Sequence, residues 1–169
     1  IETPFSEMRI ASRSLVRIDG AGFSLQRSPA RRLTIPLVWM PWQRQMMMPY
    51  LLPPELPETQ LSELSDFAMS FVERQDFDLL ETLVDMNMTI YRDFRYVSGS
   101  TRNETTPFEV DTERKGVCQD FAHLMIAMCR ALNIPARFTT AIDFGADPAL
   151  GPTDFHAYVE VYLDHRWYI

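Results

Sequence analysis

The sequence has only two cysteines, and their spacing excludes a disulfide between them. Cys118 and Cys129 lie eleven residues apart in a segment with helical patterning, which would separate their Cα atoms by about 16 Å. Bridged cysteines have Cα atoms within about 7 Å of each other. Two free thiols are typical of a reducing compartment, so we predict a cytoplasmic location.

The sequence also lacks a long apolar run and an excess of positive charge. Residues 33–42 are apolar, but the run is short and is interrupted by Pro36 and Pro41, whereas a membrane-spanning helix needs about 20 apolar residues. The net charge of −7 argues against a nucleic-acid or anionic membrane surface as partner. We therefore expect neither a membrane partner nor a nucleic-acid partner.

What the chain does contain is enough apolar sequence for one domain with a small appendage. Hydrophobic residues make up 46% of the 169 residues, which predicts a sizeable core. Residues 1–50 have short alternating runs and turns and predict a β-rich N-terminal segment, although arginines spaced four apart leave a helix open there. Residues 51–169 combine helical stripes with later strand patterns and predict an α+β core.

The most distinctive segment is residues 116–137, which we interpret as a buried helix. Helical spacing gathers most of its apolar side chains on one wide face, namely Phe121, Ala122, Leu124, Met125, Met128, Cys129 and Leu132. Asn133 suits the left-handed residue after a helix, and Pro135 prevents its continuation. A helix that is apolar over more than half its circumference is packed inside a domain.

Cys118 falls in the first turn of this helix. The free N–H groups and the positive end of the helix dipole favour a thiolate there, and Arg114 and Lys115 add positive potential. Gly116 allows a close approach of the backbone just before the cysteine. The position alone leaves two interpretations open, a nucleophile and a small buried apolar residue.

A histidine occupies the predicted strand over residues 155–163. His156 lies on its less apolar face, and Asp164 and His165 can turn the chain into a partner strand over residues 166–169. With a two-residue turn Tyr162 faces Trp167, so a residue two places beyond Ile169 would lie diagonally next to His156. A thiolate with a neighbouring imidazole is a nucleophile with its general base, although a lone strand histidine can be purely structural.

Three segments closely resemble the bacterial transglutaminase-like family, whose members are often described as cysteine proteases. They are residues 116–124 (Gly-Val-Cys-Gln-Asp-Phe-Ala-His-Leu), residues 129–137 (Cys-Arg-Ala-Leu-Asn-Ile-Pro-Ala-Arg) and residues 154–157 (Asp-Phe-His-Ala). Residues 94–96, 158–163 and 166–169 also match, so the resemblance extends over roughly residues 50–169. It implies a papain-like α+β core in which the Cys118 helix packs on an antiparallel sheet that carries His156.

The resemblance also implies roles for individual residues. Cys118 would be the nucleophile and His156 the general acid and base. The third member of the family's triad is an aspartate in an Asp-Pro element shortly after the strand over residues 166–168, and we expect it beyond Ile169. Asp120 and His123 match the motif and are interpreted as hydrogen-bonded supports.

The resemblance assigns no oxyanion donors, which we choose from the residues near the motif. The backbone N–H of Cys118 is our first choice, because it points outward at the helix start, and Tyr96 is our second. A core tyrosine is the alternative interpretation of Tyr96.

We therefore predict thiol-dependent acyl transfer from a peptide or protein amide, without a cofactor. Hydrolysis is favoured, because no amine tunnel or calcium switch is evident and the spacing of Asp143, Asp147 and Asp154 matches no calcium loop. A metal site at Cys118 and His156 is not expected, because zinc needs three or four ligands. The alternatives are a protein-glutamine transglutaminase and a catalytically inactive binding module.

Overall fold

The computed structural model describes residues 32–142 and 155–169, together with the single positions 7, 9, 11, 13 and 15. Within these residues the chain forms α1 (Pro41–Leu51), α2 (Glu58–Arg74), α3 (Leu79–Asp93), β1 (Arg95–Tyr96), α4 (Pro107–Glu113), β2 (Lys115–Gly116), α5 (Cys118–Ala131), β3 (Ala136–Ile142), β4 (Phe155–Leu163) and β5 (Arg166–Tyr168). The strands form two sheets, a parallel β1-β2 pair and an antiparallel sheet in the order β3-β4-β5. This is the predicted α+β class.

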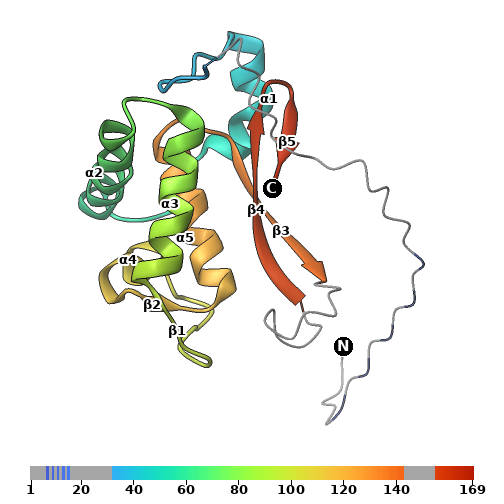
Figure 1. Cartoon of the computed structure of the whole chain (residues 1–169). Coiled ribbons are helices and arrows are strands. Elements are labelled where there is room, and N and C mark those ends of the chain that lie inside the picture. Colours follow the sequence, from blue (N-terminus) through green and yellow to red (C-terminus); the bar gives the residue numbers. More distant parts are fainter. Residues whose placement is uncertain are drawn as a thin grey trace.

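Helix α5 lies at the centre of the molecule. Helices α2, α3 and α4 cover one side of it, and the β3-β4-β5 sheet lies on the other side (Figure 1). The buried core joins the three longest helices to the inner face of the sheet, and its fully buried side chains include Phe71, Leu79, Met86, Leu124, Met128 and Leu163. The prediction of a buried central helix is confirmed.

The ends of the helices follow the sequence signals. Asp78 caps α3, because its carboxylate accepts a hydrogen bond of 3.0 Å from the backbone N–H of Glu81. Helix α5 ends before Asn133, which has a positive φ of 60° as predicted for the residue that reverses the chain. No helix in the described ranges is both long and apolar enough to cross a membrane.

The β4-β5 hairpin has the predicted register. Tyr162 pairs with Trp167 across the two-residue turn at Asp164 and His165, and both turn residues have positive φ, as a type I′ turn requires. Arg137 donates a hydrogen bond of 2.6 Å to Glu160 on the neighbouring strand, and its guanidinium lies over the Trp167 ring. The hydrogen bond to Glu160, opposed in part by burial, raises the pKa of Arg137.

The prediction of a β-rich segment over residues 1–50 is wrong for residues 41–50, which form most of α1. Pro41 suits the first position of a helix, and Gln43 accepts a hydrogen bond of 3.0 Å from the N–H of Met40. The residues that follow are mostly unbranched and form helices readily. Residues 1–6 and 16–31 lie outside the described residues, as does the aspartate-containing loop over residues 143–154.

Helix α4 is a second element that the sequence analysis missed. Thr106 and Glu109 form a reciprocal capping box around Pro107, the first residue of the helix. The Thr-Pro-x-Glu pattern was the available signal. The helix packs on α5, and it begins where the polar loop ends.

Candidate active site

Cys118 is the first residue of α5 and is half-buried. The preceding residue, Val117, is extended, so the chain changes from strand to helix at the cysteine itself. The first N–H groups of an α-helix have no intrahelical partner and point away from the helix. The thiol therefore lies at the positive end of a helix dipole, in a setting that suits a thiolate and a developing oxyanion.

Asp120 supports this first turn from inside the protein. Its side chain is only 3% exposed, and its two oxygens have separate hydrogen-bond donors. Oδ2 accepts from the N–H of Val117 at 2.8 Å, and Oδ1 accepts from the hydroxyl of Thr101 at 2.7 Å. The carboxylate thus links the residue before the nucleophile to the polar loop between β1 and α4.

Gly116 provides the space that Asp120 occupies. A Cβ atom at this position would lie 2.8 Å from the Cβ atom of Asp120, closer than real Cβ atoms approach, and 3.0 Å from its Oδ2. The pattern Gly-x-Cys-x-Asp therefore has a steric cause, because the aspartate folds back over the glycine. Sequence analysis foresaw a close approach at Gly116 but not the group that makes it.

Tyr96 lies next to the start of α5. It pairs with Gly116 in the β1-β2 sheet, and the N–H of Val97 donates to the carbonyl of Gly116 at 2.9 Å. The ring of Tyr96 meets the ring of Phe121 edge-on at 6.4 Å, and the side chain is 63% exposed. The exposed ring of Tyr96 is thus not the core tyrosine of the alternative interpretation.

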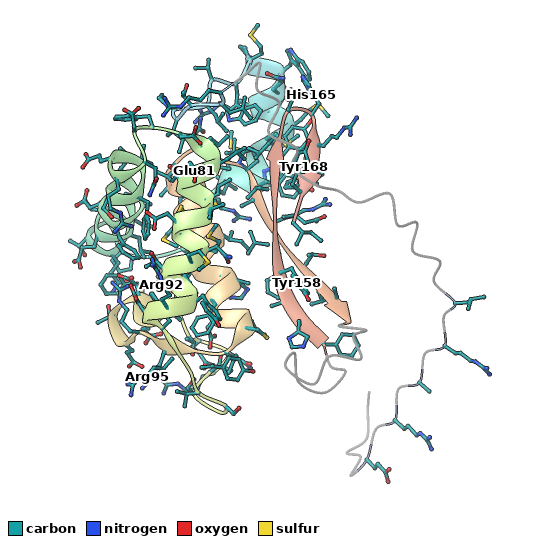
Figure 2. The ribbon with its side chains drawn as sticks, in the orientation of Figure 1. Glu81, Arg92, Arg95, Tyr158, His165 and Tyr168 are labelled. Carbon is teal, nitrogen blue, oxygen red and sulfur yellow. The ribbon has the colours of Figure 1, made fainter. Side chains whose placement is uncertain are left out.

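His156 is the second residue of β4 and pairs with Ala141 near the end of β3. The chain runs up α5, back along β3 and up β4, so α5 and β4 begin at the same end of the molecule (Figure 1). In Figure 2 this is the lower end of the molecule, where Arg95 lies. His165, in the turn of the β4-β5 hairpin, lies at the upper end, and Tyr158 of β4 lies between the two ends. The fold therefore places His156 at the end of the sheet that matches the start of α5.

A contact between α5 and β3 fixes the relative level of Cys118 and His156. The rings of His123 and Phe138 lie 5.2 Å apart. Cys118 precedes His123 by five residues, about 7.5 Å along the helix, and Ala141 follows Phe138 by three residues, about 10 Å along the strand. Both displacements point to the same end, so Cys118 and His156 lie at similar levels.

The imidazole of His156 is partly enclosed by protein. Its Nε2 is buried and has no hydrogen-bond partner in the part of the chain that the structure describes. Strand alternation places His156 on the same face as Glu160, whereas Val161 and Leu163 point into the core. By the same alternation Phe155 would face the core with Val161 and Leu163, but its side chain is 70% exposed. The alternation of buried and exposed residues at the end of β4 therefore does not extend to its first residue.

The other candidate groups have clear locations. His123 is half-buried and lies against Phe138, one and a half turns from Cys118. Within the described ranges, no group of three or more His, Cys, Asp or Glu side chains is arranged to hold a metal ion.

A family model described as the transglutaminase-like superfamily matches residues 66–169. The chain belongs to the transglutaminase-like superfamily. The matched region starts within α2 and includes α5 and the whole β3-β4-β5 sheet. It therefore contains Cys118, Asp120, Tyr96 and His156 in a single family core.

The chain is also similar to curated proteins and to solved structures. Uncharacterized proteins of Mycobacterium bovis and Mycobacterium tuberculosis are 39% identical over 104 residues, which is 59% of this chain and 32% of theirs. The chain thus spans about a third of the length of these relatives. The structure of a "Putative Cysteine Protease from Cytophaga hutchinsonii" is 38% identical with a TM-score of 0.60, over 72% of this chain and 40% of that one.

A more distant structure shares the fold alone. The periplasmic domain of TgpA from Pseudomonas aeruginosa, bound to ethylmercury, is 21% identical with a TM-score of 0.53. The match extends over 73% of this chain and 47% of that domain. The papain-like, transglutaminase-like architecture predicted from the sequence is thus confirmed.

The second cysteine of this transglutaminase-like chain provides an internal control for reactivity. Cys129 is fully buried, and burial raises the pKa of its thiol to about 12, although Arg130 opposes the shift. We expect iodoacetamide to label Cys118 in the native protein at any pH up to 9 and to leave Cys129 unmodified. Peptide mass spectrometry after brief labelling tests this.

Unfolding in guanidinium chloride should remove the difference, because it exposes both thiols to solvent. Labelling of Cys129 in the native protein at a rate similar to that of Cys118 would contradict the placement of the second thiol in the core.

Proposed function

We propose that this protein catalyses thiol-dependent acyl transfer from peptide or protein amides, with water as the favoured acceptor. The observation that carries the proposal is the placement of Cys118 at the first residue of α5, with His156 at the same end of the adjoining sheet. Membership of the transglutaminase-like superfamily and the likeness to a protein described as a cysteine protease support it.

In the proposed reaction the Sγ atom of Cys118 attacks the amide carbonyl. His156 receives the thiol proton and later donates it to the leaving amine, so that a thioester to Cys118 remains. The backbone N–H of Cys118 is the first proposed donor to the oxyanion, and Tyr96 is the proposed second donor. Water then attacks the thioester, releases the acid and restores the thiol.

An imidazole in this role needs a group that fixes its tautomer and direction. The observed pairing of Tyr162 with Trp167 supports the expected place for it. Continued in the same register, the strand that contains β5 would place its residue 171 opposite Tyr158 and diagonally next to His156. An aspartate there would complete the proposed triad.

The acceptor can be tested with an activated ester, because the first half-reaction does not depend on it. We expect p-nitrophenyl acetate to give a burst of nitrophenol and a protein whose mass is increased by one acetyl group, located on Cys118. With n-butylamine added at increasing concentration, the products are expected to remain mainly acetate. Mostly N-butylacetamide at millimolar amine would instead favour the transglutaminase alternative.

A binding module without turnover is the alternative from another class. A primed Cys118 should react with iodoacetamide at pH 6 much faster than free cysteine does, because a larger fraction of it is thiolate. Reaction as slow as that of free cysteine would favour the binding module. The proposed location is cytoplasmic, although the TgpA domain that shares this fold is periplasmic.

A further inference from the structure

The polar loop over residues 98–106 reaches α5 through a side chain that the proposed reaction does not use. The hydroxyl of Thr101 donates to Oδ1 of Asp120 at 2.7 Å, across 19 positions of the sequence. Within the described residues, the other side-chain hydrogen bonds of this loop are local, such as the one from the N–H of Arg102 to the hydroxyl of Thr105 at 2.9 Å. Thr101 is thus a specific link between the loop and the nucleophile helix.

The carboxylate that receives this bond is buried and has no ion pair among the described residues. Its two oxygens depend on two donors, the hydroxyl of Thr101 and the N–H of Val117. A buried carboxylate oxygen without a donor is strongly unfavourable. Loss of the Thr101 hydroxyl would therefore displace Asp120, and with it the bond to Val117.

On the loop side, Asp120 borders a small pocket. A small polar pocket separates the loop from α4, and Asp120 lines it together with Ser100, Thr105 and Lys115. On the opposite side, Asp120 lies against the backbone of Gly116, where no side chain intervenes. Within the described residues, the hydroxyl of Thr101 and the N–H of Val117 are the two hydrogen-bond donors to this carboxylate.

We propose that Thr101 is a positioning residue for Cys118 and acts through the buried carboxylate of Asp120. The proposal rests on the proposed role of Cys118 as nucleophile. The loop holds Asp120, Asp120 holds Val117, and Val117 sets the direction in which the first turn of α5 presents its thiol and its N–H groups.

The test compares Thr101→Val, which removes only the hydroxyl, with Thr101→Ser, which keeps it. Thr105→Val is the matched control, because it removes a hydroxyl from the same loop that bonds locally. Hydrogen exchange of the Val117 amide reports on the link, and iodoacetamide labelling of Cys118 at pH 6 and pH 8 reports on the thiol. Neither measurement requires a substrate.

In Thr101→Val we expect exchange at Val117 to rise at least tenfold, and the ratio of labelling rates at pH 6 and pH 8 to fall at least threefold. Thr101→Ser and Thr105→Val should stay within twofold of the wild type. A Thr101→Val variant with a lower melting temperature but unchanged exchange and rate ratio would overturn the proposal. If wild-type Cys118 reacts like free cysteine, the proposed function fails. Hydrogen exchange of the Val117 amide then still shows whether Thr101 fixes the first turn of α5.

Discussion

Replacing Cys118 with alanine is expected to abolish amide and ester turnover, with a loss of at least about 10³-fold in kcat/KM. The nucleophile forms the covalent bond to the acyl group, and no other described thiol can replace it, since Cys129 is fully buried. His156→Ala should cause a loss of similar size, because the two groups act as one unit. The nitrophenol burst and the acetylated protein should disappear in both variants.

The double variant makes this prediction specific. If Cys118 and His156 act together, losing both should cost little more than losing either one. Cys129→Ala serves as the control for cysteine loss, and its turnover should stay close to that of the wild type once the protein is folded. Multiplied losses in the double variant would show that His156 acts separately from Cys118, and full activity in Cys118→Ala would remove the proposed nucleophile.

The second large effect is expected at Gly116. Alanine there would place its Cβ atom 2.8 Å from that of Asp120, so the aspartate or the backbone has to move. Overpacking of this kind costs about 1–3 kcal/mol, and a carboxylate separated from its buried donors adds about 1–3 kcal/mol. We expect Gly116→Ala to lower the free energy of unfolding, measured in urea, by about 2–4 kcal/mol. The rate at which iodoacetamide labels Cys118 at pH 6 should also fall to a small fraction of the wild-type rate.

Gly99 is the matched control for this substitution. It has a positive φ of 76°, and a Cβ atom there would meet nothing within 4 Å. Gly99→Ala should therefore show only the cost of a left-handed alanine, about 1–2 kcal/mol, with normal reactivity at Cys118. Equal losses of stability and reactivity in the two variants would mean that the contact with Asp120 is not what makes Gly116 necessary.

Much of the fold could be predicted because its signals are local. The apolar face of α5, the left-handed Asn133 and the two-residue turn at Asp164 and His165 each follow from a few neighbouring residues. The helix α1 was missed because short apolar runs with prolines fit either a strand or a helix. Helix α4 was missed although its capping signal at Thr106 and Glu109 was present.

The candidate site was predictable as residue types but not as an arrangement. The motif around Cys118 and the one around His156 identify the two groups, yet their separation of 38 residues gives no distance. The contact of His123 with Phe138 and the register of β3 with β4 show that Cys118 and His156 lie at similar heights along α5 and the sheet. The sequence gives no sign of the role of Thr101, because nothing distinguishes it from other threonines in a polar loop.

The sequence by itself determined the helices after residue 57 except α4, the register of the β4-β5 hairpin and the family, since these depend on periodicity, turn chemistry and short motifs. Only the tertiary structure decided which groups surround the first turn of α5. It folds Asp120 over Gly116, joins the loop through Thr101 and sets Tyr96 beside the first turn. The contacts of Thr101 and Tyr96 join residues that are 19 and 20 positions apart in the chain, and no local sequence pattern encodes them.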